Sequence, residues 1–198
     1  VVSKNNCDIG FAFDGDGDRL GVIDCKRRIV WGDQILAILS RDILRKNPGA
    51  KIIGDVKCSS IFYDEINRLG GKSIMWASGH SLIKAKMIEE EALLGGEMSA
   101  HIFFADDYYG FDDAIYASLR LLQTINNEKK SLDNIYDELP KMLNTKEIRI
   151  DCSEEEKFEI VERIKLKLKN EGADITEIDG VRFNSKNGWW LLRASNTQ

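Results

Sequence analysis

Short apolar runs and amphipathic stretches alternate through the first 140 residues of the chain. In DIGFAFDGDGDRLGVID, at residues 8–24, two apolar runs flank a Gly/Asp cluster, a pattern that predicts strand, tight loop and strand. From Asp33, a plausible helix N-cap, apolar residues recur at helical spacing until Asn47-Pro48-Gly49. The further expected elements are strand 50–56, helix 59–70, strand 72–77, helix 81–91, strands 92–97 and 101–105, helix 112–125 and a short helical stretch within 131–142. This order predicts an α/β fold made of βαβ units.

The pattern changes near residues 140–146. KEIRI at 146–150 predicts a strand, and a long charged helix is expected from Ser153 to about Lys169. Short strands are then expected near residues 173–178, 180–184 and 188–193. This order predicts a small α+β unit with an antiparallel sheet.

The composition of the chain excludes several classes of protein. The 198 residues are 43% hydrophobic and 31% charged, with 28 Lys and Arg against 33 Asp and Glu and a net charge of −5. Without a basic excess we expect no nucleic-acid partner, and no run approaches the roughly 18 apolar residues of a membrane span. The four cysteines lie far apart and predict free thiols in a reducing, cytoplasmic compartment.

The acidic loop carries the first candidate chemistry. Asp14, Asp16 and Asp18 alternate with glycines, so their like charges crowd together unless a cation binds them. The glycines let the backbone curl until the carboxylates converge on one hard ion. A few carboxylates with open coordination positions suit Mg²⁺ acting on a phosphate group.

The acidic loop also allows other interpretations. A simple acidic hairpin turn needs no ion, and an EF-hand fails because Arg19 and Cys25 occupy its sixth and twelfth positions from Asp14. The loop also resembles that of haloacid-dehalogenase-type phosphatases, in which Asp14 would be the nucleophile, although Asp18 stands where that family has Thr or Val. Arg19 can bind a phosphate or pair with a neighbouring acid.

Three further motifs follow the acidic loop in a fixed order. They are Gly79-His80-Ser81, then Gly96-Glu97-Met98-Ser99-Ala100-His101 and finally Arg193-Ala194-Ser195-Asn196-Thr197, with GFDD at 110–113. Together with the acidic loop they resemble the α-D-phosphohexomutases, most closely the phosphomannomutase/phosphoglucomutase branch. The resemblance spans nearly the whole chain and implies a four-domain enzyme that moves a phosphoryl group between the 1- and 6-positions of a hexose, through a bisphosphate and a phosphoserine.

The resemblance also implies which domains are present. We expect residues 1–28 to be the end of metal-binding domain 2, residues 29–142 sugar-binding domain 3, of three-layer α/β type, and residues 143–198 part of phosphate-binding domain 4. The family's Ser-His-Asn context of the phosphoserine does not occur in these 198 residues. We therefore expect the chain to need the N-terminal domains of the same enzyme and to be inactive alone.

Residue roles follow from the same resemblance. It implies Mg²⁺ bound by Asp14, Asp16 and Asp18, catalytic roles for Arg19 and His101, and hexose phosphate as the ligand. The implied substrate-binding residues are Lys57, Gly79, His80, Glu97, Ser99, Arg193, Ser195, Asn196 and Thr197. Asp112 and Asp113 are expected to cap the helix that follows them.

The chain departs from the family pattern at a few positions. Ala100 stands where the family has Gly, and a positive φ there would cost Ala about 1 kcal/mol. Ala77, Ala105 and Asp107 make the predicted cleft less basic than usual. Glu97-Met98-Ser99 favours mannose or glucose phosphates over amino-sugar phosphates. Two other functions stay open: a metal-dependent sugar-phosphate phosphatase and a non-catalytic sugar-phosphate-binding module.

Overall fold

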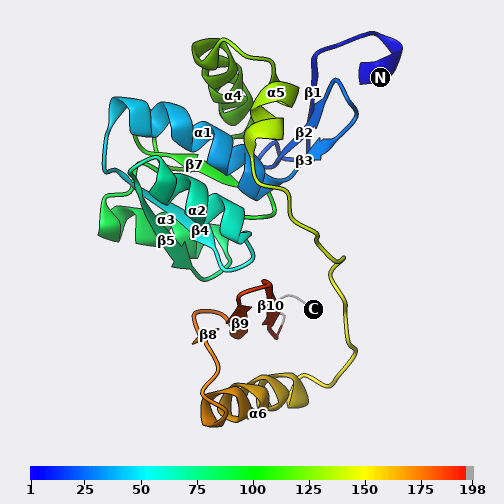
Figure 1. The fold of residues 1–198 in the computed structure, drawn as a ribbon, viewed down its shortest axis with the longest axis vertical. Helices are drawn as coiled ribbons and strands as arrows, with labels where there is room; N and C mark the ends of the chain where they lie inside the picture. Colours follow the sequence, from blue (N-terminus) through cyan, green and yellow to red (C-terminus); the bar gives the residue numbers. More distant parts are fainter. Residues whose placement is uncertain (195–198) are drawn as a thin grey trace. The chain divides into compact units, whose positions relative to one another are not determined.

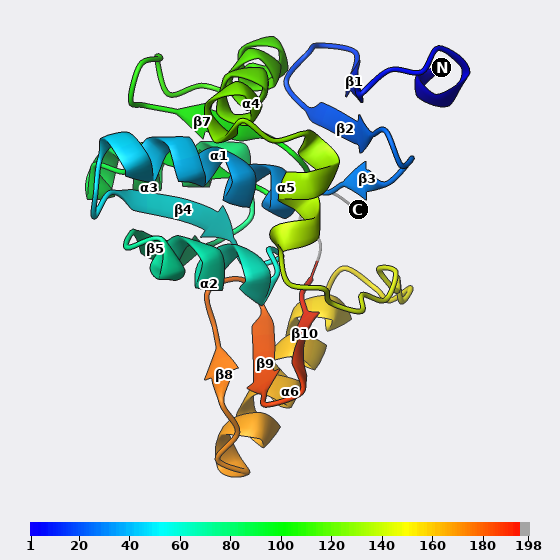
Figure 2. The same ribbon diagram turned by 45° about the horizontal axis from the view of Figure 1, so that its top comes forward.

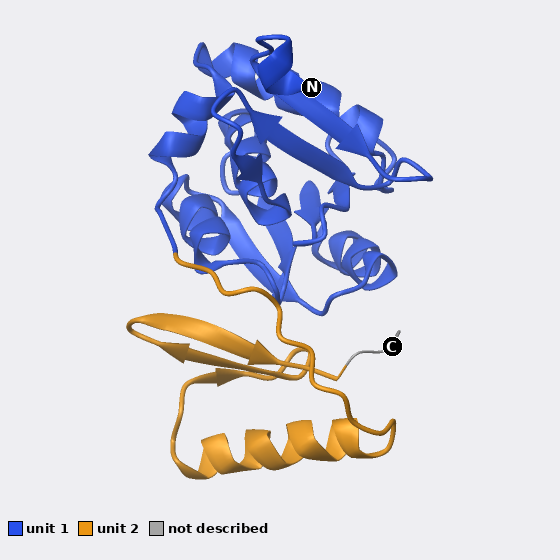
Figure 3. Ribbon diagram, turned by 90° about the vertical axis from the view of Figure 1, so that its right-hand side faces the viewer, with its two compact units in different colours: residues 1–142 blue, residues 143–198 orange. Residues whose placement is uncertain are grey.

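The computed structural model describes residues 1–194. The chain divides into two compact units, residues 1–142 and the chain from residue 143 onward, which Figure 3 shows in different colours. Among the described residues, the first unit contains two sheets and the second contains one, and each unit has its own helices. The assignment of residues 1–28, 29–142 and 143–198 to three family domains stays a prediction.

A four-stranded sheet forms the centre of the first unit (Figure 1). Its strand order is β5 (Lys72–Trp76), β4 (Lys51–Asp55), β6 (Leu94–Gly96) and β7 (Ile102–Phe104). β4 runs parallel to both β5 and β6, and β7 is antiparallel to β6. The carboxyl ends of the parallel strands therefore meet at one edge of the sheet, where ligands bind in open α/β folds.

Helices cover both faces of this sheet. α1 (Gly32–Lys46) and α2 (Ser60–Arg68) contribute to the larger apolar core, which includes Ile52 of β4. The next residue, Ile53, points to the opposite face and joins a smaller cluster with residues of α3 (His80–Glu90). Successive strand residues alternate between faces, so β4 is buried on both sides. The result is the three-layer α/β arrangement that the sequence predicts.

Two further helices extend the larger core. α4 (Ala114–Glu128) and α5 (Leu132–Glu138) contact α1, and Figure 2 shows them beside it. The Asp113 carboxylate accepts a 2.9 Å hydrogen bond from the Tyr116 amide and caps α4, as expected.

The first residues form a small antiparallel sheet. After a 3₁₀ turn at Val2–Lys4, strands β1 (Ile9–Phe13), β2 (Leu20–Asp24) and β3 (Ile29–Val30) pair in that order. The β1–β2 hairpin is predicted correctly, and the acidic loop forms its turn. Leu20 of β2 is buried in the same core as α1, so this sheet packs within the first unit.

The second unit is a small α+β arrangement. It contains α6 (Glu156–Asn170) and the strands β8 (Ile175–Thr176), β9 (Val181–Ser185) and β10 (Gly188–Leu192). The strand order is β10-β9-β8 and both pairings are antiparallel. α6 contacts β9, whose Val181 is fully buried. The antiparallel sheet predicted for this region is therefore confirmed.

Two local predictions outside the candidate site are wrong. KEIRI at 146–150 is not a strand, because none of the described strands pairs with it, and its Ile148 and Ile150 side chains are exposed. Asp33 is not the N-cap of α1, since Trp31 holds that position and Asp33 lies in the first turn. Its carboxylate instead accepts a 3.0 Å hydrogen bond from the Ser59 amide. None of the described helices has the length and apolarity needed to cross a membrane.

Candidate active site

The acidic loop joins β1 to β2 and gathers its carboxylates. Oxygen atoms of Asp14, Asp16 and Asp18 all lie within 4.8 Å of one another. Gly17 adopts a φ of 75°, and the Asp14 Oδ1 atom accepts hydrogen bonds from the Asp18 amide at 3.2 Å and the Arg19 amide at 3.1 Å. The glycine lets the backbone turn sharply enough for the carboxylates to converge.

The charges of this loop suit a divalent cation. Burial raises the pKa of Asp18, and the neighbouring charges of Asp14 and Asp16 raise it further against the opposing charge of His101. The buried Oδ1 atom of Asp18 accepts no hydrogen bond from the described residues. Several carboxylate oxygens, one of them without a donor, form a ligand set that fits Mg²⁺.

Backbone contacts hold the acidic loop against the loop at 97–101. Arg19 and His101 form an isolated antiparallel bridge, and the Leu20 amide donates to the Ala100 carbonyl at 3.2 Å. The Ala114 amide, at the start of α4, donates to the Gly17 carbonyl at 3.0 Å. The predicted metal loop and the predicted sugar loop are thus neighbours fixed by main-chain hydrogen bonds.

Asp112, which the sequence analysis expected to cap the following helix, instead orients the His101 ring. The His101 Nδ1 atom lies 3.0 Å from Asp112 Oδ2 and 3.5 Å from Asp18 Oδ2. Asp112 does not cap α4; its Oδ1 atom accepts a 3.2 Å hydrogen bond from Lys84 instead. Burial opposes ionisation of Asp112, but hydrogen bonds from its own amide and from Lys84 keep its pKa below the usual value.

The two histidines of the chain lie together. The ring centroids of His80 and His101 are 5.9 Å apart, and the ring planes are inclined by 29°. His80 is the first residue of α3 and is exposed, whereas His101 is buried. The segment Gly79-His80-Ser81 and the loop at 97–101 are well separated in the sequence, and the sheet brings them together.

Glu97 links the same two loops. Its side chain is 5% exposed, and its Oε1 atom accepts a 2.8 Å hydrogen bond from the Gly79 amide. Burial raises the pKa of Glu97, and the nearby charge of Asp55 also raises it, while the Gly79 hydrogen bond opposes the shift. Ser99 is exposed, two residues further along. One polar side chain is therefore fixed and the other is free to meet a ligand.

Two basic residues lie beside acids. Lys57 follows β4, and its Nζ atom is 3.8 Å from Asp55 Oδ2. The Arg19 Nε atom lies 3.0 Å from Asp14 Oδ2, with the side chain 55% exposed. Both cations keep exposed surface, so each can reach an anionic ligand from its paired position.

Arg193 belongs to the second unit. It follows β10, and its Nη2 atom is 3.0 Å from Asp179 Oδ2. Asp179 is a contact that the sequence analysis missed, because the two residues are far apart along the chain. The other predicted phosphate-binding residues, Ser195, Asn196 and Thr197, lie outside the described residues.

Two family models together match most of the chain. Residues 31–143 match the family model described as phosphoglucomutase/phosphomannomutase, alpha/beta/alpha domain III, and residues 147–198 match that of the C-terminal domain. The chain belongs to the phosphoglucomutase/phosphomannomutase family. The domain III match includes the loops that carry Lys57, His80 and Glu97. The resemblance seen in the sequence is confirmed.

Individual relatives of the family extend the match to the acidic loop. A phosphomannomutase/phosphoglucomutase of Pseudomonas putida is 46% identical over 99% of this chain, and a phosphoglucomutase of Neisseria gonorrhoeae is 41% identical over 100% of it. A crystal structure of a family protein from Burkholderia thailandensis is 38% identical, with a TM-score of 0.91, and covers the whole chain. This chain spans 42% of the P. putida and B. thailandensis proteins and 43% of the N. gonorrhoeae protein.

Proposed function

We propose that this chain supplies the metal-binding and sugar-binding part of a phosphohexomutase of the phosphomannomutase/phosphoglucomutase type. One observation carries the proposal: the carboxylates of the acidic loop converge beside the loop of Glu97 and His101, and main-chain hydrogen bonds join the two loops. The reaction is the transfer of a phosphoryl group between the 1- and 6-positions of mannose or glucose phosphate. The names of the relatives support this reaction class.

In this proposal Asp14, Asp16 and Asp18 hold Mg²⁺. A bound Mg²⁺ ion supplies electrostatic stabilisation of the charge that develops on a transferring phosphoryl group. The Arg19 guanidinium is close enough to the loop to bind a phosphate oxygen in place of Asp14. The phosphoserine that donates the phosphoryl group belongs to the N-terminal domains. Transfer of this group to the hexose phosphate gives the hexose bisphosphate.

The sugar is proposed to bind between the loops at 57, 79–80 and 97–99. Glu97 and Ser99 offer a carboxylate and a hydroxyl to adjacent sugar hydroxyls, which both orientations of the phosphosugar present. Lys57, Gly79 and His80 complete the substrate site. In the second unit, Arg193, Ser195, Asn196 and Thr197 are proposed to bind the phosphate that is not transferred.

His101 is proposed to move the proton of the reacting hydroxyl. Asp112, 3.0 Å from Nδ1, accepts the Nδ1–H hydrogen bond and leaves Nε2 as the nitrogen that can take or give a proton. Lys84 in turn fixes the Asp112 carboxylate. This chain of contacts makes Asp112 and Lys84 positioning residues for His101.

The two alternative functions are less well supported. A phosphatase with Asp14 as nucleophile is not favoured, because the relatives that cover this chain are named as mutases. A non-catalytic binding module finds no support among these relatives, which are named as mutases. We propose a cytoplasmic location and no mutase turnover by these 198 residues alone.

Calorimetric titration tests the sugar site. Glucose 1-phosphate, mannose 1-phosphate and N-acetylglucosamine 1-phosphate are titrated into the chain in the presence of Mg²⁺. We expect Glu97→Ala to weaken binding of the first two about tenfold, because a hydrogen bond to a charged group contributes about 1.5 kcal/mol or more. The matched control is Glu155→Ala, at an exposed acid of the second unit, which should leave the affinities unchanged.

Two outcomes would count against the proposal. Equal affinities for all three sugars, unaffected by Glu97→Ala, would remove Glu97 from the sugar site. Rapid interconversion of glucose 1-phosphate and glucose 6-phosphate by the chain alone would show that the proposed need for the N-terminal domains is wrong.

A further inference from the structure

One buried carboxylate outside the proposed ligand sets lies beneath the substrate loops. Asp55 is the last residue of β4, the strand that pairs with both β5 and β6, and it has no exposed surface. A carboxylate is not buried without strong compensating contacts, since its desolvation is costly. The contacts of Asp55 therefore indicate what the buried charge does.

Each oxygen of the Asp55 carboxylate contacts two groups. Oδ1 accepts from the Met98 amide at 3.1 Å and from the Cys58 thiol at 3.1 Å. Oδ2 accepts from the Ser78 hydroxyl at 2.7 Å and lies 3.8 Å from the Lys57 Nζ atom. Burial raises the pKa of the Cys58 thiol well above its usual value, so Cys58 keeps the proton that it donates.

These partners belong to three separate loops. Lys57 follows β4, Ser78 precedes His80 after β5, and Met98 lies between Glu97 and Ser99 after β6. No sequence motif connects the loops, and they meet because the parallel strands end at one edge of the sheet. One carboxylate thus fixes all three segments of the proposed sugar site.

The negative charge of the Asp55 carboxylate matters for these contacts as much as its shape does. The described contacts of the carboxylate present an amide N–H, a thiol, a hydroxyl and an ammonium group, all of which can donate. A carboxylate accepts on both oxygens, whereas an amide of the same shape accepts on one side and donates on the other. A carboxamide at this position would turn its NH2 group toward either the Met98 amide or the Lys57 ammonium, so at least one of these donors would lose its acceptor.

We infer that Asp55 is a positioning residue that holds the loops of Lys57, Ser78–His80 and Glu97–Ser99 in the arrangement that binds the hexose phosphate. Asp55 does so from beneath the site, through its hydrogen bonds and its charge. The inference rests on the proposed function for its ligand, but the joining of the loops can be measured without one.

The test compares Asp55→Asn with a matched variant at a second buried acid. Asp33 is 3% exposed, and its carboxylate accepts hydrogen bonds from the Ser59 and Gln34 amides rather than from the Ser78 or Met98 loop. Asp33→Asn therefore removes an equally buried charge without releasing those loops. Both variants are made in the full 198-residue chain.

Two measurements are made on each variant. Calorimetry with glucose 1-phosphate and Mg²⁺ should show about tenfold weaker binding for Asp55→Asn and a change below about twofold for Asp33→Asn. Hydrogen exchange should be faster in at least one of the segments 78–80 and 97–99 in Asp55→Asn, and in neither segment in Asp33→Asn. Unchanged exchange and affinity in Asp55→Asn, or equal effects in both variants, would overturn the inference.

These measurements distinguish failure of the proposed function from failure of the inference about Asp55. If the wild-type chain binds no hexose phosphate, the function is wrong, and the exchange rates still decide whether Asp55 joins the loops. If Asp55→Asn does not fold, Ser78→Ala replaces it, because this change removes the 2.7 Å hydrogen bond to Oδ2 and leaves the Asp55 carboxylate in place. Ser78→Ala should speed exchange at residues 78–80 and weaken binding about threefold, and no change in either would refute the role of Asp55.

Discussion

At the scale of single residues, Ala100 shows how a departure from a family pattern becomes a structural cost. Its φ is 70°, in the left-handed region, where a Cβ atom is crowded. The turn is fixed on both sides, since the Ala100 amide donates to Glu97 and the Ala100 carbonyl accepts from Leu20. The positive φ anticipated from the sequence is therefore present at this position.

Ala100→Gly should stabilise the chain. Glycine removes the Cβ strain but adds freedom to the unfolded chain, so the net gain in the free energy of unfolding is about 0.5 to 1 kcal/mol. Urea unfolding measures it. The same chemical change at Ala117, buried within α4, should lower the free energy of unfolding by about 1 kcal/mol. A loss of stability in Ala100→Gly would show that φ strain does not govern this loop.

Single residues also mark the limit of sequence analysis at the site. The acidic loop could be predicted because its three carboxylates are two residues apart along the chain. The partnership of Asp112 with His101 could not, because either of two adjacent acids can cap a helix and only the fold shows that Asp113 does so. Asp55 was missed in the same way, although its place at the end of a buried parallel strand was a usable signal.

At the scale of elements, the periodic patterns predicted most helices and strands. Whether an apolar run becomes a strand also depends on whether another strand pairs with it. The strands of the central sheet are short apolar runs that lie between helices, so their order along the chain identifies them. KEIRI has a strand-like alternation but no described partner, and alternation alone does not make a strand. Register and neighbours are tertiary properties that one segment does not encode.

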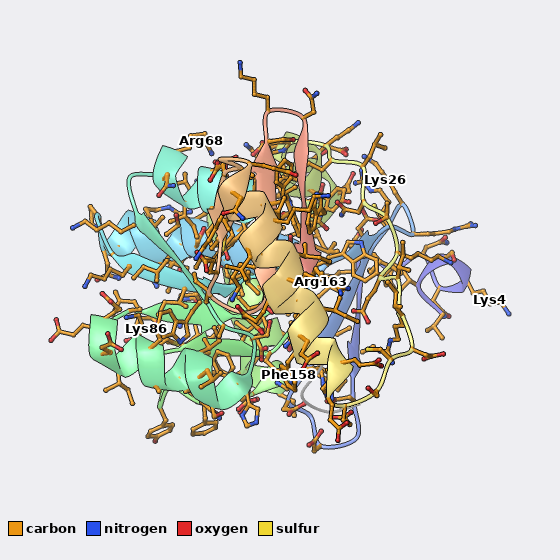
Figure 4. All side chains as sticks on the ribbon, turned by 90° about the horizontal axis from the view of Figure 1, so that it is seen from below. Lys4, Lys26, Arg68, Lys86, Phe158 and Arg163 are labelled. Carbon is orange, nitrogen blue, oxygen red and sulfur yellow. The ribbon has the colours of Figure 1, made fainter. Side chains whose placement is uncertain are left out.

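An ion-pair group joins α3 to the sheet and makes stability depend on pH. Glu90 receives hydrogen bonds from Lys86 at 2.8 Å and from Lys51 of β4 at 2.9 Å. These contacts, that of Lys86 first, lower the pKa of Glu90 from 4.5 to about 2. Figure 4 labels Lys86, which lies on α3. A lowered carboxyl pKa stabilises the fold above the unfolded value, and that stabilisation is lost as the pH falls toward the folded value.

Glu90→Gln should therefore remove part of the acid sensitivity. The free energy of unfolding of the wild-type chain should exceed that of the variant at about pH 6, and the difference should shrink as the pH falls from about 5 to about 2. Urea unfolding at several pH values measures this difference. Glu91→Gln is the control, since Glu91 forms no ion pair in the part of the chain that the structure describes. A difference that stays constant with pH would contradict the assigned shift.

At the scale of the whole molecule, the two units differ in how much apolar surface they bury. The larger core of the first unit draws on the β1–β3 sheet, the central sheet and four helices, whereas the buried apolar residues of the second are Val161 and Val181 among those described. Small units bury a lower fraction of their surface and are correspondingly marginal. The first unit also contains the acidic loop, both histidines and Asp55, so the proposed metal and sugar sites need nothing from the second for their internal geometry.

A chain of residues 1–142 should therefore fold by itself and bind Mn²⁺, a spectroscopic substitute for Mg²⁺, as tightly as the 198-residue chain. Calorimetry should give one cooperative transition with a midpoint within about 5 °C of the main transition of the longer chain, since a shift of that size in a domain this large corresponds to roughly 1 to 2 kcal/mol. Asp16→Asn in the short chain serves as the binding control and should weaken Mn²⁺ binding, because it removes one of the converging carboxylates. A non-cooperative transition, or Mn²⁺ binding that depends on residues 143–198, would mean that the second unit is part of the metal site's folding unit.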